Sequence, residues 1–453
     1  MFFVSQYYQS IIYDEDSAII WHSIFGHPMV VDRALADELT YRVPSEEIDI
    51  REILKGVCET DDEMYDLVDE LLDAHILITS VRDESCDISQ VFTKHNFGRA
   101  SKVDSISLMM SEDCTDECFY CMRPSSKRQH HKMPKLMSAK IAKKSIDNYI
   151  AILRINNLKE GDISFGGGEP LLNWDVIQDC LPYIEHCRRA LGIPIRVRIS
   201  TNLKLMTEDI AATLIYYGVE VRTSFDGTKV SSHDYDEVIR GLEIMEELGS
   251  PVKGFKMMVT RDNFADLSTR IIDLAHKHSM KEVRVDVDVI GMTNTPVEMI
   301  AHKLVQLRKY AKPRGINVVG FWSRPAENLR LDPEKDDVGF CRGEKGNSLC
   351  VSPSGQVFPC GYSNHELCDY KNMPLVYREY SYNKILLDRD LTTLDDCYGC
   401  PILGFCRGGC MINREANGTR SEKVARMCEL YLIMTRMILR ETAVATANDQ
   451  GKT

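Results

Sequence analysis

The stretch CTDECFYCM, residues 114–122, contains cysteines at positions 114, 118 and 121. The spacing is Cys-x3-Cys-x2-Cys, and no fourth cysteine lies nearby. Three thiolates on one short loop can bind three irons of a cubane iron–sulfur cluster, which leaves the fourth iron without a protein ligand. Such an iron can bind a small molecule and pass an electron to it.

Two other interpretations of these cysteines stay open. Structural zinc needs four ligands, so a zinc site would take its fourth ligand from His130, His131 or a distant residue. The cysteines could also be inert thiols that pack as small apolar side chains. The spacing favours the cluster, and the motifs downstream add to that preference.

A glycine-rich turn, SFGGGEP at residues 164–170, follows the cysteines at the end of an expected strand. Glycine there permits a close backbone approach that a Cβ atom would block. The two motifs together resemble the radical S-adenosylmethionine (SAM) enzymes. The resemblance implies that Cys114, Cys118 and Cys121 hold a [4Fe–4S] cluster whose free iron binds the methionine part of SAM.

The same resemblance assigns SAM contacts to further positions. It places Gly167, Gly168 and Glu169 at the methionine ammonium, and Tyr120 against the adenine. It places Ser200 and Asn202, in ISTNL, near the ribose and carboxylate, and Asp226, in SFDGT, at the end of the fourth strand. The alternative for the polar residues is a helix cap or a turn, where Asn and Asp are common.

The chain from residue 104 alternates expected strands and helices, which indicates a parallel sheet. The strands are expected at 104–110, 162–167, 195–200, 219–225, 253–259 and 283–289, and the helices near 138–157, 174–191, 207–217, 235–248, 263–279 and 296–314. Six such units resemble the partial (β/α)6 barrel of the radical SAM family. Both motifs follow strands directly, so we expect them at the carboxyl ends of the strands, where parallel barrels carry their active sites.

A second set of cysteines lies near the C-terminus. Cys341 precedes a predicted hairpin with its turn at 353–355, and Cys360 follows it. The segment CYGCPILGFCRGGC then has the spacing Cys397-x2-Cys400-x5-Cys406-x3-Cys410, and Cys428 comes after a gap. These seven cysteines resemble the SPASM extension, which houses two auxiliary iron–sulfur clusters.

By that resemblance, the first auxiliary cluster takes Cys341, Cys360 and Cys410, and Cys350 is a candidate fourth ligand. The second takes Cys397, Cys400, Cys406 and Cys428. The resemblance thus implies SAM and three [4Fe–4S] clusters as cofactors. Zinc is the alternative over 397–410, because Cys-x2-Cys also suits a zinc ribbon.

Residues 1–95 hold 21 acidic and 6 basic residues, a net charge of −15, whereas the whole chain carries −13. The asymmetry suggests a separate N-terminal module. Three expected strands, a helix at 61–74 and a last strand at 75–80 resemble a winged-helix element that binds peptides in peptide-maturing enzymes. Inert packing is the alternative, and the negative charge argues against nucleic acid.

We expect three domains: 1–95, a barrel at 96–330 and a cysteine-rich extension at 331–453. Residues 82–103 are polar and predict a linker. No apolar run is long enough to span a membrane, the first residues do not resemble a signal peptide, and sixteen cysteines in such a chain point to metal rather than disulfides. We therefore expect a cytoplasmic protein.

The resemblance implies an enzyme that cleaves SAM to a 5′-deoxyadenosyl radical and abstracts a hydrogen from a ribosomally made precursor peptide. The peptide would bind through its leader, a flavodoxin or ferredoxin would supply electrons, and the product would carry a thioether, carbon–carbon or ether crosslink. The alternatives are formylglycine formation on a protein Ser or Cys, as in anaerobic sulfatase maturases, and peptide epimerisation or hydroxylation. A redox sensor without catalysis is disfavoured, because it has no need of the GGE turn.

Overall fold

The computed structural model describes residues 2–98, 103–116, 118, 121, 135–225, 235–331, 338–378, 397–410, 412–414 and 422–450. The chain folds into two compact units, each made of segments distant in sequence. The first unit comprises residues 1–97, 321–345 and 388–453, and the second comprises 98–320 and 346–387. These units combine separate chain segments, whereas the three domains expected from the sequence are continuous stretches. Those three domains stay a prediction.

The second unit is built on a ten-stranded sheet with the order β12-β11-β10-β9-β8-β7-β6-β13-β14-β15. Strands β6 to β12 run parallel. They are β6 (Ser105–Ser111), β7 (Gly161–Gly167), β8 (Ile195–Thr201), β9 (Glu220–Ser224), β10 (Gly254–Val259), β11 (Glu282–Val287) and β12 (Asn317–Val319). The six expected strands are therefore confirmed, and β12 adds a seventh parallel strand at the edge.

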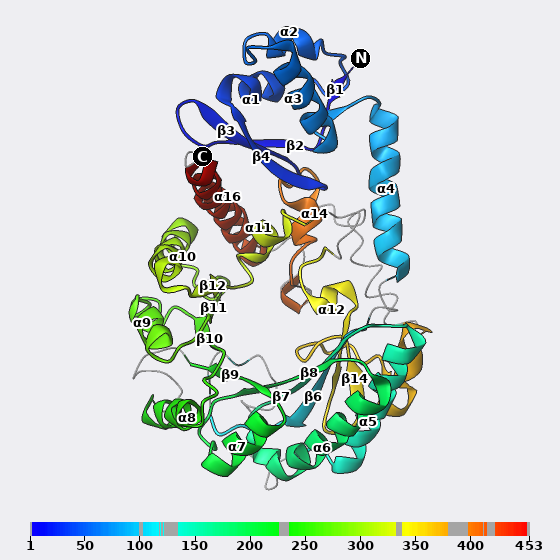
Figure 1. The fold of residues 1–453 in the computed structure, drawn as a ribbon, viewed down its shortest axis with the longest axis vertical. Helices are drawn as coiled ribbons and strands as arrows, with labels where there is room; N and C mark the ends of the chain where they lie inside the picture. The colour runs from blue at the N-terminus through cyan, green and yellow to red at the C-terminus, as the bar shows by residue number, and fades with distance from the viewer. Residues whose placement is uncertain are drawn as a thin grey trace. The chain divides into compact units, whose positions relative to one another are not determined.

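Helices follow the strands, as the alternation predicted. They are α5 (Ala139–Ile155), α6 (Trp174–Leu191), α7 (Glu208–Tyr216), α8 (Tyr235–Glu247), α9 (Arg270–Lys277) and α10 (Val297–Ala311), with the short turns η3 (Pro170–Asn173) and η4 (Lys312–Arg314). Ser138 and Thr207 cap α5 and α7 through their hydroxyl groups. Helices α5, α6 and α7 lie along the outer side of strands β6–β8 (Figure 1). Only α9 is much shorter than expected.

The predicted hairpin after Cys341 is confirmed. It consists of β13 (Ser348–Val351) and β14 (Gln356–Phe358), followed by β15 (Cys368–Asp369) and η5 (Tyr370–Arg378). Gly355 adopts φ +93° in the turn, a conformation that glycine accepts without steric cost. Strand β13 then pairs in parallel with β6. The hairpin thereby extends the same sheet that carries the first cysteine loop.

The first unit begins with a small antiparallel sheet, β2 (Tyr8–Ile12), β3 (Ser17–His22) and β4 (Gly26–Asp32). The helices α1 (Arg33–Thr40), α2 (Ile50–Leu54) and α3 (Asp61–Asp73) follow, and β5 (Leu77–Ile78) pairs with β1 (Phe3–Val4). A capping box between Thr60 and Glu63 starts α3. The core contains the fully buried Ile20, Leu35 and Leu71. The expected strand–helix–strand pattern of this module is therefore present.

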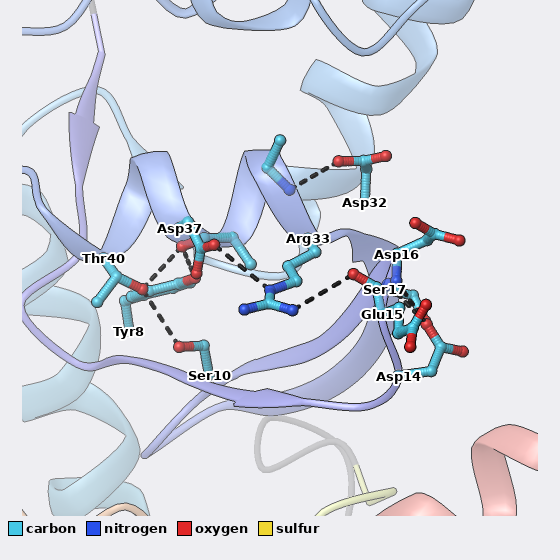
Figure 2. A network of polar contacts seen from close by, with 12 residues as sticks. Tyr8, Ser10, Asp14, Glu15, Asp16, Ser17, Asp32, Arg33, Asp37 and Thr40 are labelled. Carbon is cyan, nitrogen blue, oxygen red and sulfur yellow. Dashed lines mark hydrogen bonds and ion pairs between the residues drawn. The ribbon is translucent and has the colours of Figure 1, made fainter.

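Polar contacts join the β2–β3 hairpin to α1 (Figure 2). Asp14 accepts hydrogen bonds from the backbone N–H of Asp16 and from Ser17, at 2.6–3.0 Å. Arg33 donates to the carbonyl oxygen of Glu15 at 3.4 Å and pairs with Asp37 at 3.6 Å. The acidic turn is therefore fixed by its own backbone and by one arginine.

The prediction of a linker over residues 82–103 is wrong, because Val81–Gly98 form the helix α4. Ser80 accepts a hydrogen bond from the backbone of Asp83 at its start. Ile88 and Val91 are buried in a cluster with Phe25. The segment is mostly polar, so its two buried apolar residues were not recognised as a helix pattern. They are three residues apart and therefore share one helix face.

The rest of the first unit consists of the short helices α11 (Arg324–Asn328), α12 (Arg342–Lys345) and α14 (Leu403–Cys406), and the long helix α16 (Glu422–Gln450). Leu430, Met434 and Ile438 of α16 are buried. Within the described part of the chain, no helix is long and apolar enough to cross a membrane.

Candidate active site and cluster-binding cysteines

The first cysteine loop begins where β6 ends, as the sequence predicted. Cys114 follows the strand by three residues, and the backbone N–H of Cys121 donates to the carbonyl of Cys118 at 3.0 Å. Burial, followed by the nearby carboxylates of Glu169 and Asp116, raises the pKa of the Cys114 thiol. A cation is therefore needed to stabilise the thiolate. Tyr120 and Asp226 lie outside the described residues.

The glycine-rich turn lies directly against this loop. The backbone N–H groups of Gly168 and Glu169 donate to the carbonyls of Ser111 and Asp113 at 2.8 and 2.9 Å. A Cβ atom on Gly168 would lie 2.1 Å from the Asp113 oxygen, and one on Gly167, where φ is +135°, would lie 2.4 Å from that of Ser111. Both glycines are required so that the turn can hold the cysteine loop in place.

Glu169 is turned inward and is only 1 % exposed. Its Oε1 accepts from the backbone of Leu171 at 3.0 Å and from the Thr201 hydroxyl at 2.7 Å, and its Oε2 accepts from the backbone of Asn202 at 2.8 Å. Burial raises the pKa of Glu169 to about 7 despite these three donors. The carboxyl group therefore joins the ends of β7 and β8.

Asn202 also contacts the cysteine loop rather than open solvent. Its Nδ2 donates to the Thr115 hydroxyl at 2.7 Å and to Asp116 Oδ2 at 2.5 Å. Asp116 Oδ1 in turn forms an ion pair with Lys204 at 2.6 Å. The end of β8 thus orients the loop between its first two cysteines. The sequence predicted Asn202 as a site residue, but neither Asp116 nor Lys204.

Ser200 lies on the other face of β8 from the buried Val197 and Ile199, and it accepts a hydrogen bond from Lys256 of β10 at 2.9 Å. Burial, with Arg222, Arg284 and Arg198 nearby, lowers the pKa of Lys256 to about 8. Among the described residues, the Lys256 ammonium forms no ion pair. This lysine is a site candidate that the sequence analysis missed.

Lys256 belongs to a charged face formed by alternate residues of β7 to β11. Arg198 pairs with Asp162, Arg222 with Glu220 and Glu282, and Arg284 with Asp286. Parallel strands covered on both faces are apolar almost throughout, whereas IRVRIS and EVRVDV alternate charged and apolar residues. That alternation was the sequence signal for a polar inner face.

The first unit brings four of the C-terminal cysteines together. Burial, followed by the neighbouring Cys428, Cys400 and Cys397, raises the pKa of Cys406 far above its ordinary value. Burial also raises the pKa of Cys400, to about 11, with Cys397 and Cys428 adding to the effect. This is the set that the sequence assigned to the second auxiliary cluster. Neighbouring thiols that are buried or half-buried fit a metal centre that would stabilise them as thiolates.

The other predicted set is distributed between the two units. Cys341 and Cys410 are near each other in the first unit, where burial raises the pKa of Cys341. Cys350, in β13, and Cys360 belong to the second unit. Cys350 is 2 % exposed. The ligand set of a first auxiliary cluster therefore stays a prediction.

Among the described residues, no three His, Cys, Asp or Glu side chains are placed to hold a single metal ion. The zinc alternatives therefore gain no support from the structure. A cubane cluster spaces its thiolates more widely than one ion does, because several irons and sulfides lie between them.

The fold and the site define an α/β enzyme whose thiolate loop lies at the carboxyl ends of parallel strands. Residues 108–272 match the model of the Radical SAM superfamily. The chain carries a radical SAM domain and is a radical SAM enzyme.

Similarity to one relative extends along almost the whole chain. The radical SAM cyclopropyl synthase TigE of Paramaledivibacter caminithermalis is 27 % identical over 97 % of this chain and 96 % of its own length.

Two solved structures share the fold. A structure of anSMEcpe with bound AdoMet has a TM-score of 0.58 at 15 % identity and covers 76 % of this chain and 99 % of its own. Streptococcus suis SuiB, bound to S-adenosylmethionine, has a TM-score of 0.53 at 17 % identity and covers 94 % of this chain and 100 % of its own.

Proposed function

We propose that the protein is a radical SAM maturase that abstracts a hydrogen from a ribosomally made precursor peptide and installs an oxidative crosslink. The observation that carries this proposal is the similarity to a cyclopropyl synthase over 97 % of the chain, well beyond the radical SAM domain. Of the crosslinks expected from the sequence, that relative favours a carbon–carbon bond over a thioether or an ether.

The residues of the second unit hold the reacting groups in place. Cys114, Cys118 and Cys121 would ligate the [4Fe–4S] cluster, on a loop fixed by Gly168 and Asn202. When bound and reduced, this cluster and SAM together supply the radical that removes the hydrogen atom. Glu169 would support this loop by joining the ends of β7 and β8, because its buried carboxyl group accepts three hydrogen bonds there.

The charged inner face supplies the groups that would orient SAM and the peptide. Ser200 and Lys256 hydrogen-bond to each other, and the Lys256 ammonium is a buried cation of this face that forms no ion pair within the described residues. A carboxylate, from SAM or from the peptide, would complete its contacts. We assign adenine and substrate contacts to Tyr120 and Asp226 by resemblance only.

The C-terminal cysteines would hold the clusters that take up the electron left when the crosslink forms. Cys397, Cys400, Cys406 and Cys428 lie near one another, with Cys397 and Cys406 buried and the other two half-buried, which suits a second auxiliary [4Fe–4S] cluster. Cys341, Cys360 and Cys410, with Cys350 as a candidate fourth ligand, would hold the first. A flavodoxin or ferredoxin in a reducing cytoplasm would supply the electron that starts each turnover.

The N-terminal module would bind the leader of the precursor. Its three-stranded sheet leaves β2 and β4 as edges, and a peptide can add a strand to such an edge. The net charge of −15 over residues 1–95 favours a leader with basic residues and disfavours nucleic acid. This assignment as a winged-helix peptide-recognition element rests on the order of its elements.

A second candidate function is formylglycine formation on a protein Ser or Cys. It is favoured by the fold shared with anSMEcpe, of which one structure holds AdoMet and the Cp18Cys peptide. That chain covers 76 % of the present one. Epimerisation or hydroxylation of a peptide would use the same hydrogen abstraction with a different last step.

The test is a reaction with any short peptide that a gene beside this one encodes, using anaerobically reconstituted protein, SAM and dithionite. A crosslink gives a product that lacks two hydrogens and has no carbonyl that reacts with a hydrazine reagent. A hydrazine-reactive product would support formylglycine instead. An unchanged mass with deuterium taken up from solvent would indicate epimerisation, and the gain of one oxygen would indicate hydroxylation.

The control is the triple variant Cys114→Ala, Cys118→Ala and Cys121→Ala. It should retain the C-terminal iron but cleave no SAM, because no iron would remain to bind it. Product formation by this variant would refute the assignment of the first cysteine loop.

A further inference from the structure

Arg414 is an arginine enclosed by the cysteine-rich part of the first unit. Arg414 is only 5 % exposed. Its Nε donates to the carbonyl of Gly408, and its Nη2 donates to Cys397 Sγ at 3.4 Å. The Nη1 is buried and has no hydrogen-bond partner among the described residues. The guanidinium therefore contacts the group of cysteines and still has one nitrogen, Nη1, that can donate further hydrogen bonds.

No carboxylate of the described residues balances the charge of this arginine. A guanidinium stays protonated in proteins, and a buried cation without a counter-charge costs several kcal/mol. Within the described residues, Arg414 forms no ion pair with Asp or Glu. Among the described residues, Cys397, Cys400 and Cys406 are neighbours that can become negative, and Arg414 opposes the rise in the pKa of Cys400 and Cys406.

The four thiols of the proposed second cluster cannot balance the charge while they are neutral. Burial raises the pKa of Cys400 to about 11 and also raises the pKa of Cys406. Binding of a metal centre would deprotonate them, and four thiolates around a [4Fe–4S] core give a net anionic group. The buried arginine would then offset part of the negative charge of the cluster.

We propose that Arg414 is the counter-charge of the second auxiliary cluster and raises its reduction potential through the N–H···S hydrogen bond to Cys397. This inference rests on the proposed ligand set Cys397, Cys400, Cys406 and Cys428. Reduction adds negative charge to a cluster, so a fixed cation and a donor on a ligating sulfur favour the reduced form. Arg414 would thus keep this cluster able to accept an electron from the substrate radical.

The test measures midpoint potentials by redox titration followed with electron paramagnetic resonance. The background is the Cys114→Ala, Cys118→Ala and Cys121→Ala variant, so that the SAM-binding cluster does not contribute. Adding Arg414→Gln should lower the equilibrium constant for one-electron reduction about tenfold or more, which corresponds to about 59 mV. Arg414→Lys should cause a smaller fall, because lysine keeps the charge but lacks the planar fork of donors.

Arg440→Gln is the matched control in the same unit. Arg440 donates to the carbonyl of Ile12 from an exposed position on α16, so its loss should leave the potential unchanged. An Arg414→Gln protein with full iron content and an unchanged potential would overturn the inference. If Arg414→Gln loses its iron or does not fold, the Arg414→Lys protein decides: a lowered potential supports the inference and an unchanged one refutes it.

Failure of the cluster assignment gives a different result. Replacing Cys397, Cys400 and Cys406 with Ala should remove roughly four irons per chain together with the signal that Arg414→Gln shifts. Unchanged iron in that variant would refute the ligand set itself, whatever the potentials of the Arg414 variants.

Discussion

Glu169 supports the cysteine loop indirectly, through hydrogen bonds to residues at the ends of neighbouring strands. Its two oxygens accept hydrogen bonds from Leu171, Thr201 and Asn202. Asn202 in turn contacts Asp116 between the first two cysteines. The protonation state of Glu169 therefore affects how firmly the strand ends hold the cysteine loop.

The raised pKa of Glu169 predicts that the protein is less stable in mild alkali than in mild acid. Its pKa is about 7 in the folded protein, against an ordinary 4.5. Between these values the folded state binds more protons than the unfolded state, so stability falls as pH rises, by about 3 kcal/mol in all. The contribution is complete below about pH 4.5 and is lost as pH rises through about 7.

Urea unfolding of the wild type and of Glu169→Gln at about pH 5 and about pH 8 measures this effect. Glutamine does not titrate, so the decline from acid to alkali should be smaller in the variant. Equal declines in the two proteins would mean that Glu169 is ionised throughout this range.

For single residues, the sequence indicated which positions belong to the site better than it indicated what those residues contact. Cysteine and glycine were recognisable because few other residues can ligate iron or allow the backbone approach seen at Gly168. Lys256 and Arg414 were not recognisable, because a lone basic residue looks the same whether its partners are solvent or buried thiols. Their roles depend on contacts between segments distant in sequence.

Among the elements, the turn between β7 and η3 gives the sharpest prediction. Gly168→Ala should prevent assembly of the proposed SAM-binding cluster on the first cysteine loop. The added Cβ would lie 2.1 Å from the carbonyl oxygen of Asp113, and a backbone atom cannot rotate away from it. Roughly four irons per chain should be lost together with SAM cleavage, while the iron of the proposed C-terminal clusters remains.

Gly166→Ala is the control for that substitution. The nearest atom to its Cβ would be Ser107 Oγ at 3.7 Å, an ordinary contact. Iron content and SAM cleavage of this variant should match the wild type. Equal iron content in both variants would show that the turn does not position the loop.

Elements with one strong pattern were predicted well. The six strands and most of the helices of the second unit lie within a few residues of their expected bounds. The helix α4 was missed because only Ile88 and Val91 of its apolar residues are described as buried, and polar residues surround them. Tertiary packing against Phe25, which the sequence does not display, explains why this segment is ordered.

On the scale of the whole molecule, the N-terminal module is a structural neighbour of the last cysteines. Trp21 Nε1 donates to the carbonyl of Pro401 at 2.8 Å, and the backbone N–H of Gly404 donates to the carbonyl of Ser23 at 2.9 Å. Cys397 and Phe25 belong to the same buried cluster. Composition and charge separated residues 1–95 from the rest, but could not reveal that the two ends of the chain fold together.

Deletion of residues 1–95 is therefore expected to do more than remove the proposed leader binding. It should also cost roughly four irons per chain, because the segment around Cys397–Cys406 would lose its packing partners. SAM cleavage by the second unit should persist.

Trp21→Phe is a milder version of the same test, since it removes the hydrogen bond to Pro401 and keeps most of the apolar volume. Ile12→Ala, at a residue that is 48 % exposed, should have no effect on iron. A truncated protein with full iron content would show that the C-terminal cysteines hold their cluster without the module.

The pairing of β13 with β6 also sets the order in which the protein can be completed during synthesis. Strand β6 ends at Ser111, whereas its partner β13 starts at Ser348. The ribosome must therefore release more than two hundred further residues before that side of β6 is paired. Until then the nascent sheet exposes an open edge, which is a site for aggregation. The strand leading into the first cysteine loop is therefore the last of the parallel strands β6–β11 to be paired on both sides.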